Sequence, residues 1–337
     1  MFMKIYYNNL FFIFILFFST LISISSNTWF GCWIGLEINL MSFIPLISNS
    51  HNTLSSEASL KYFLVQSIAS INFLFMILMK MIIMSIMFNS LLSILINSSL
   101  LMKMGSVPFH FWFPNIIEGL SWINCMFLFT WQKIAPMILL SYYFNYNFLF
   151  LIMILNVIIG AIGGLNQSSL RKLLTFSSIN NLGWMILSLI ISNNLWMIYF
   201  LIYFLINLIL CMMFYFFNMF FLNQLFFLKI NFLTKFFLIL NLFSLYGLPP
   251  FLGFFSKWII INFMMMNNFF ILSMIFIMMS LIMLFYYLRI LYSSFFINYL
   301  KMKWLKINFK LNYMFYFINF FNLISIFSII FSTFFFI

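Results

Sequence analysis

Four ionisable residues lie deep inside apolar tracts of the sequence, where a charge is costly: Glu37, Lys103, Lys133 and Lys257. One ionised side chain at the centre of a bilayer costs about 2.5 to 3.5 kcal/mol, so four would cost on the order of 10 kcal/mol without compensation. Burial favours the neutral form of an amine, and a nearby carboxylate favours its charged form. A buried lysine beside a glutamate can therefore hold a proton in one arrangement and release it in another, which is the chemistry of a proton relay.

A structural interpretation of these four residues remains open. They would then form ion pairs between packed helices, or extend from helix ends to the membrane surface. The four residues lie on four different predicted spans, so one misplaced span boundary cannot account for all of them. We therefore expect a functional role.

Two of the lysines lie beside predicted breaks in their helices. Lys103 precedes GSVPFHFWFP, which holds one glycine and two prolines, and Lys257 follows YGLPPFLG. Proline removes a backbone donor and clashes with the preceding turn, so backbone polar groups are left free within the membrane. Such backbone is tolerated only where protein or water satisfies it, so we expect a hydrated pocket beside each lysine.

The composition places the chain in a membrane. Of its 337 residues, 66% are hydrophobic and 5% are charged, and the mean hydropathy is +1.17, well above that of soluble domains. In this setting the net charge of +12 indicates topology and not a nucleic-acid partner. Cys32, Cys125 and Cys211 show no metal or redox spacing, so we expect small core residues. The sequence also lacks haem, phosphate-loop and iron–sulfur motifs, so we expect no redox cofactor in this chain.

The sequence predicts an all-α polytopic membrane protein with about eleven transmembrane helices. The predicted spans lie near residues 8–26, 28–48, 57–79, 83–104, 121–143, 148–165, 170–192, 195–220, 233–265, 268–292 and 312–336. The breaks fall in the fourth and ninth spans, as expected for two five-helix repeats, near 8–143 and 148–292, followed by a C-terminal helix. An odd number of helices makes the second repeat inverted, and interrupted helices in corresponding positions indicate a transport site.

The basic residues predict the orientation of the chain. Only Lys80 lies at helix ends on one side, whereas the other flanking basic residues lie on the side of the N-terminus: Lys4, Lys61, Arg171, Lys172, Lys229, Lys235, Arg289, Lys301, Lys303, Lys306 and Lys310. The N-terminus is therefore predicted on the positive side, which is the matrix in a mitochondrion. A first helix without a cleavage site and a composition poor in arginine favour a chain made inside the organelle.

Three further features have more modest interpretations. Lys133, in TWQKIAP, lies three residues before Pro136, so its span is also expected to be perturbed. His110 is either a second titratable station or a hydrogen-bonded residue of the interfacial aromatic belt, and the sequence leaves both open. Glu57 and Lys61 are expected to form an ordinary helix-surface pair.

Six motifs in order carry a resemblance that covers nearly all of the chain: WIGLEINLMSFIPL, EASLKYFLVQSIAS, KMGSVPFHFWFP, TWQKIAP, GGLNQSSLRKLLTFSSINNLGW and LPPFLGFFSKW. With these motifs the chain resembles the NADH dehydrogenase subunit 2 family, antiporter-like membrane subunits of mitochondrial respiratory complex I. The resemblance implies a single membrane domain of inverted five-helix repeats in the mitochondrial inner membrane. It also implies other complex I subunits and lipids as partners, with flavin, iron–sulfur clusters and ubiquinone bound by other subunits.

The resemblance also implies a role for each buried ionisable residue. Glu37 matches the family's glutamate that pairs with a lysine, Lys103 matches that lysine, Lys133 the central lysine and Lys257 the terminal one. Proton transfer along them would be coupled to electron transfer from NADH to ubiquinone elsewhere in the complex.

The sequence departs from the family's pattern in two places. Asn181 stands where the family commonly has a histidine, so a relay there would need water or another residue. Asn115 stands where an acid usually follows the proline. Glu118, three residues later on about the same helix face, is expected to substitute for it.

Two other functions compete with a proton-conducting subunit of a redox-driven pump. The chain could be a structural scaffold of the membrane arm without a proton path of its own, with lysines that stabilise a hydrated interior. It could instead be a free-standing cation/proton antiporter of the related fold.

Overall fold

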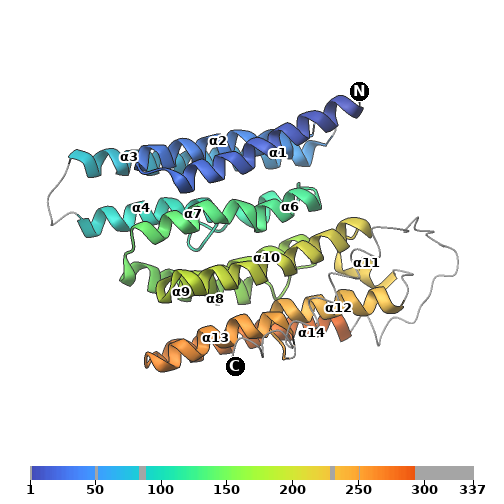
Figure 1. Cartoon of the computed structure of the whole chain (residues 1–337). Coiled ribbons are helices and arrows are strands. Elements are labelled where there is room, and N and C mark those ends of the chain that lie inside the picture. Colours follow the sequence, from blue (N-terminus) through green and yellow to red (C-terminus); the bar gives the residue numbers. More distant parts are fainter. Residues whose placement is uncertain (1, 50–51, 83–88, 228–231, 250, 293–337) are drawn as a thin grey trace. The chain divides into compact units, whose positions relative to one another are not determined.

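The computed structural model describes residues 2–49, 52–82, 89–227, 232–249 and 251–292 (Figure 1). These residues form fourteen α-helices and one isolated β-bridge between Ser169 and Phe221. The helices fall into two compact units that divide between Leu155 and Asn156, inside α8 (Tyr146–Gly163). The predicted last span, near 312–336, lies outside the described residues.

The first unit is built from two groups of helices. Its helices before α8 are α1 (Phe2–Ser25), α2 (Trp29–Ile47), α3 (Thr53–Ile82), α4 (Asn89–Met104), α5 (Trp112–Ile117), α6 (Trp122–Phe129) and α7 (Trp131–Tyr142). In Figure 1, α1, α2 and α3 lie side by side, and α4, α6 and α7 lie along them. Because α4 packs on both α3 and α7, its C-terminal end lies inside this unit.

The second unit is centred on α9 and α10. Its helices after α8 are α9 (Leu170–Ile191), α10 (Asn193–Phe216), α11 (Leu222–Phe227), α12 (Phe232–Tyr246), α13 (Leu252–Met266) and α14 (Phe270–Tyr292). The helix α9 is almost entirely buried. It packs on α10 and α13, and α10 packs in turn on α12 and α13. The polar residues of α9 therefore face protein neighbours.

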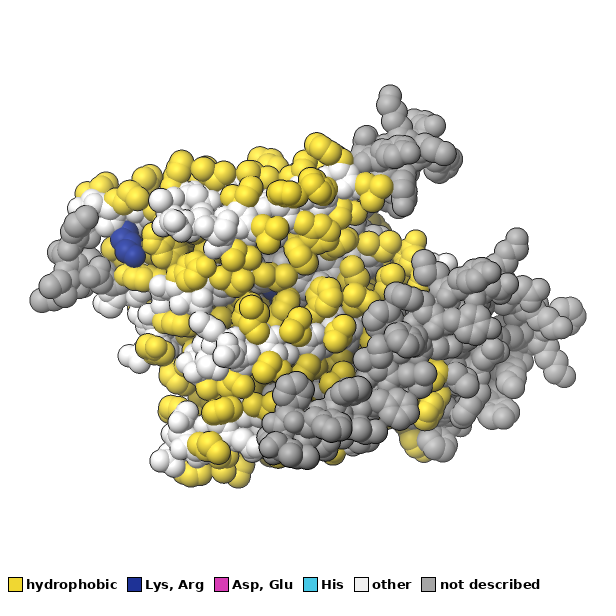
Figure 2. Space-filling view, viewed as in Figure 1, with side chains coloured by type: hydrophobic (Ala, Val, Ile, Leu, Met, Phe, Trp, Pro, Cys, Tyr) yellow, Lys and Arg dark blue, Asp and Glu magenta, His cyan; other side chains and the backbone are white. Residues whose placement is uncertain are grey.

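Seven segments among the described residues are long and apolar enough to cross a membrane: Trp29–Ile47, Thr53–Ile82, Trp122–Tyr142, Tyr146–Gly163, Leu170–Ile191, Asn193–Phe216 and Phe270–Ile290. Figure 2 shows one face of the molecule, on which hydrophobic side chains predominate. On α3, for example, the exposed side chains include Leu60, Leu64, Ile71 and Phe75. An apolar surface of this extent fits lipid and not water, so the chain is a multi-pass membrane protein.

Hydroxyl groups on these helices find partners within their own helix. Ser19, Ser70, Ser99 and Ser188, among others, each donate to the carbonyl three residues earlier. Lipid offers no hydrogen-bond partners, so a serine in a spanning helix must bond to its own backbone or to a neighbouring helix. This explains how a chain rich in serine remains helical within the membrane.

The helix breaks expected from the sequence are present. The predicted fourth span ends at Met104, and the predicted ninth span is divided into α12 and α13. The predicted fifth span is also interrupted, at Thr130 between α6 and α7, and Pro136 lies within α7.

Two smaller expectations are also confirmed. Glu57 and Lys61 form an exposed ion pair on the surface of α3. Cys32, Cys125 and Cys211 are buried, and within the described part of the chain none of them forms a disulfide.

Candidate functional site

The two helix breaks are built in the same way. Gly105 and Gly247 follow the last residues of α4 and α12 and have positive φ angles of 72° and 78°. The next residue, Ser106 or Leu248, donates its N–H to the carbonyl five residues back, at 3.1 and 3.4 Å. This is the Schellman arrangement, in which a left-handed residue ends the helix, and glycine adopts it without strain. The local sequence therefore determines where both helices stop.

Lys103 is buried in the last turn of α4. Its backbone carbonyl accepts a hydrogen bond from Gln66 Nε2 of α3 at 3.1 Å. Glu37, on α2, is half-buried, and its carboxylate interacts electrostatically with the lysine. The two are not in direct contact, since the ion pair within 4 Å that the described residues contain is Lys61–Glu57. Glu37 therefore acts on Lys103 through space.

A small polar cavity lies beside Lys103. Its lining residues come from α2, α3, α4 and α7: Leu36, Asn39, Leu40, Tyr62, Gln66, Lys103, Gln132 and Pro136. Inside the cavity, the centre of a water molecule can occupy a volume of about 10 Å³. The cavity therefore has room for about one water molecule. This is the polar space expected beside the break at Gly105.

Two amide side chains close this cavity by a reciprocal hydrogen bond. Asn39 Nδ2 donates to Gln132 Oε1 at 2.9 Å, and Gln132 Nε2 donates to Asn39 Oδ1 at 3.1 Å. The pair joins α2 to α7 across 93 residues of sequence. Since each amide satisfies the other, the two polar groups can remain inside a membrane protein at little cost.

We expect Asn39→Leu to lower the stability of the protein by about 1 to 3 kcal/mol, because Gln132 is left without its partner. Thermal unfolding of the intact assembly that contains the chain measures this loss. Adding Gln132→Leu to Asn39→Leu should cost less than the sum of the two single variants. Strictly additive losses would show that the two amides do not support each other.

Lys133 is among the most deeply buried side chains of the first unit, with 1% of its surface exposed. It lies in the first turn of α7, just after the interruption at Thr130. Its Nζ atom is 5.7 Å from the centre of the Phe113 ring, a distance at which a cation is attracted to an aromatic face. Lys133 does not line the cavity beside Lys103, but its neighbour Gln132 does. Glu37, Lys103 and Lys133 thus lie in the same compact unit.

Lys257 lies in the second unit, against the other helix break. Its Nζ atom donates to the carbonyl of Tyr246, the last residue of α12, at 2.9 Å and lies 5.6 Å from the centre of the Trp184 ring. The last carbonyls of a helix lack partners within it and carry partial negative charge. The ammonium group therefore satisfies a backbone carbonyl freed by the break, and this interaction stabilises the lysine at its position.

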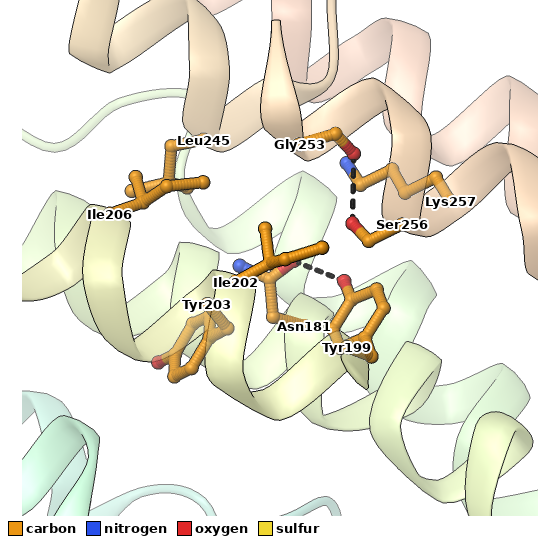
Figure 3. A pocket seen from close by; sticks show the side chains of 9 residues that line it. All are labelled: Asn181, Tyr199, Ile202, Tyr203, Ile206, Leu245, Gly253, Ser256 and Lys257. Atoms are coloured by element: carbon orange, nitrogen blue, oxygen red, sulfur yellow. Dashed lines mark hydrogen bonds between the residues drawn. The ribbon is translucent and has the colours of Figure 1, made fainter. Parts of the chain in front are cut away.

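A second cavity, lined by both polar and apolar side chains, borders Lys257 (Figure 3). It too leaves about 10 Å³ for the centre of a water-sized sphere. Its lining residues are Asn181, Tyr199, Ile202, Tyr203, Ile206, Leu245, Gly253, Ser256 and Lys257. Tyr199, on α10, donates its hydroxyl hydrogen to Asn181 Oδ1 of α9 at 3.0 Å. Each broken helix therefore has a lysine and a cavity for about one water molecule beside it.

The two accessory residues lie outside these cavities. His110 is buried, with its ring 4.3 Å from that of Phe111, and its Nδ1 atom has no hydrogen-bond partner among the described residues. Glu118 and Asn115 are both exposed, so they share a face of the chain as expected. The structure does not bring either accessory residue, His110 or Glu118, to the cavity beside Lys103.

Sequence reasoning missed the polar residues that complete the cavities, namely Asn39, Gln66, Gln132, Tyr199 and Ser256. A uniformly apolar helix shows no amphipathic face, so its sequence does not tell which polar residue points inward. A polar residue within a span was the signal that could have found them. Across the described residues, no group of three or more His, Cys, Asp or Glu side chains could hold a metal ion.

Comparison with known proteins places this chain in a family. The family model for the NADH:quinone oxidoreductase/Mrp antiporter transmembrane region matches residues 26–283. NADH-ubiquinone oxidoreductase chain 2 of Anopheles gambiae is 51% identical over 314 residues, which cover 91% of this chain and 92% of the relative. The chain belongs to the NADH-ubiquinone oxidoreductase chain 2 family.

Another member and a solved structure extend the comparison. The Aedes aegypti member is 48% identical over 333 residues, which cover 91% of each chain. A chain in the structure of respiratory complex I from Thermus thermophilus with bound aureothin is 23% identical. It matches with a TM-score of 0.79 over 86% of this chain and 70% of its own length. This likeness shows that the two chains share a fold.

Proposed function

We propose that the chain is a proton-translocating, antiporter-like membrane subunit of NADH:ubiquinone oxidoreductase, respiratory complex I. Its membership of the chain 2 family supports the assignment to this complex. The observation that carries the proton-translocating role is the burial of Lys103, Lys133 and Lys257, each beside an interruption in a helix. Buried ionisable residues in membrane helices mark ion and proton pathways.

We assign the proton-transfer roles to four residues. Glu37 modulates the charge of Lys103 through space, Lys133 is the central carrier, and Lys257 is the terminal one. Each transfer needs hydrogen-bond reach or a bridging water molecule, and the cavities beside Lys103 and Lys257 each have room for one. His110 and Glu118 keep accessory roles in this proposal.

The electron-transfer chemistry belongs to other subunits in this proposal. Flavin, iron–sulfur clusters and ubiquinone would bind outside this chain, which is a non-redox subunit of the enzyme. Its partners would be neighbouring antiporter-like subunits and membrane lipids. The proposed location is the mitochondrial inner membrane, with the N-terminus in the matrix.

The proposed architecture has about eleven spans in one membrane domain. Two inverted five-helix repeats, near 8–143 and 148–292, would be followed by a C-terminal helix near 312–336. The matching ends of α4 and α12 support this arrangement, because each is a glycine-terminated break beside a lysine. Interrupted helices in corresponding positions are typical of inverted-repeat transporters.

Replacing either lysine at a break by methionine should lower coupled proton translocation at least about tenfold, because methionine fills similar space but cannot hold a proton. The variants are Lys103→Met and Lys257→Met, and the measurement is protons moved per NADH oxidised in membranes with the complex assembled. Lys61→Met is the control, because Lys61 is exposed and paired with Glu57 on the surface of α3.

Wild-type proton translocation in both assembled variants would contradict the proposal and favour a structural scaffold. Activity of the isolated chain as a cation/proton exchanger would favour the free-standing antiporter. The same set of membranes, with and without the rest of the complex, distinguishes these outcomes.

A further inference from the structure

The cavity beside Lys257 offers hydrogen-bond acceptors on one set of side chains. The Tyr199 hydroxyl donates its hydrogen to Asn181 Oδ1 at 3.0 Å, and the Ser256 hydroxyl donates its hydrogen to the carbonyl of Gly253 at 3.0 Å. A hydroxyl that has donated its hydrogen still has lone pairs to accept with. Both hydroxyl oxygens belong to residues that line the cavity and can therefore serve as acceptors there.

The same cavity also has donors. Lys257 carries three N–H groups when charged, and one of them is used on the Tyr246 carbonyl. Asn181 accepts from Tyr199 through its oxygen, which leaves the two N–H groups of its amide as donors. Two donor side chains and two acceptor side chains thus border one space.

This combination matches the needs of one water molecule. Water donates twice and accepts twice, and a buried water molecule makes about three hydrogen bonds in a space of about 10 to 15 Å³. The cavity leaves about 10 Å³ for its centre. An apolar occupant would offer no acceptor to the remaining N–H groups of Lys257 and Asn181, which is costly within the membrane.

We infer that this cavity holds one water molecule between Lys257 and Tyr199, and that Tyr199 is a positioning residue for the charged lysine. The Tyr199–Asn181 hydrogen bond turns the hydroxyl lone pairs toward the cavity, where they accept from the water molecule that solvates the ammonium group. Asn181 cannot titrate, so its part is to orient Tyr199. The inference rests on the proposed function only in giving Lys257 a role in proton transfer.

Tyr203 provides a matched comparison on the same helix. Figure 3 shows the Tyr199 hydroxyl directed at Asn181, whereas the Tyr203 hydroxyl points away from both. The Tyr203 hydroxyl interacts instead with Ser178 and Asn207. Both tyrosines are buried, so the two differ in where the hydroxyl points and not in burial.

Electron cryo-microscopy of the assembled wild-type complex tests the water molecule directly. We expect density for one water molecule within about 3.2 Å of both Lys257 Nζ and Tyr199 Oη, and we expect Tyr199→Phe to lose it. A well-resolved cavity without that density in the wild type overturns the inference. This test holds even if a variant fails to assemble.

The rate of NADH-driven proton translocation by the assembled complex tests the positioning role. Tyr199→Phe should slow coupled proton translocation about tenfold, the effect of losing a hydrogen bond that supports a charged group. Tyr203→Phe should slow it much less, because the Tyr203 hydroxyl interacts with Ser178 and Asn207 and not with Asn181. Adding Asn181→Leu to Tyr199→Phe should cause no further loss, because both variants remove the same oriented acceptor. A merely structural role would instead give additive losses.

The outcomes separate this inference from the proposed function. If Lys257→Met stops proton translocation while Tyr199→Phe translocates normally, only the positioning role fails. If Lys257→Met translocates normally, the proposed role of the lysine fails, and the water density alone decides whether the site is built as inferred.

Discussion

Lys133→Met is expected to abolish coupled proton translocation while the complex still assembles. Lys133 has 1% of its surface exposed, and its Nζ atom lies 5.7 Å from the centre of the Phe113 ring. Methionine occupies nearly the same space and suits apolar surroundings, so packing should survive the change. The variant loses the group that binds a proton. Coupled proton translocation should therefore fall at least about 100-fold if the relay has no parallel path. Protons moved per NADH oxidised, with assembly checked on native gels, measure the effect.

Lys133→Arg separates proton exchange from fixed charge. Arginine keeps the positive charge but does not release its proton in proteins, so this variant should be as defective as Lys133→Met. Wild-type translocation by Lys133→Arg would show that a fixed charge at this position is sufficient. Lys61→Met is again the control for loss of one lysine at the surface of α3.

Gly253→Ala is expected to prevent the second unit from folding. A Cβ atom at Gly253 would lie 1.7 Å from the carbonyl oxygen of Ser244 on α12. The clash is with backbone and not with a side chain that could rotate, so α12 and α13 would have to separate. We expect a loss of more than about 4 kcal/mol, the size of effect that marks a disrupted core. The amount of assembled protein should fall below a tenth of the wild-type amount.

Gly31→Ala is the matched control for that prediction. A Cβ atom there would meet the Cβ atom of Ser26 at 2.9 Å and Oγ1 of Thr28 at 3.2 Å. Both residues lie in the short connection between α1 and α2, which can shift more easily than the backbone of a packed helix. Alanine is also the better helix former by about 1 kcal/mol, which offsets part of the crowding. Near-normal assembly of Gly31→Ala beside failed assembly of Gly253→Ala is the expected contrast. Equal assembly of both would mean that α12 and α13 do not approach this closely.

The helix breaks and the candidate lysines could be predicted from the sequence because both depend on local chemistry. Glycine and proline restrict the backbone wherever they occur, so GSVP and GLPP end helices without help from distant residues. A charged residue inside an apolar span is conspicuous for a similar reason, since its cost comes from the lipid around it. Length and hydropathy determined the helical class, because a chain in lipid must satisfy its backbone within each segment.

Only the tertiary structure decided which polar side chains meet. Asn39 pairs with Gln132 across 93 residues, and Tyr199 reaches Asn181 from the neighbouring helix. The inward and outward faces of these helices are both mostly apolar, so hydropathy does not tell which polar side chains meet. Glu118 illustrates the same limit, because it shares the helix face of Asn115 as predicted, yet that face is exposed. Local sequence determines where a helix ends, whereas the packing of several helices decides what surrounds each lysine, because cavity walls come from residues far apart in the chain.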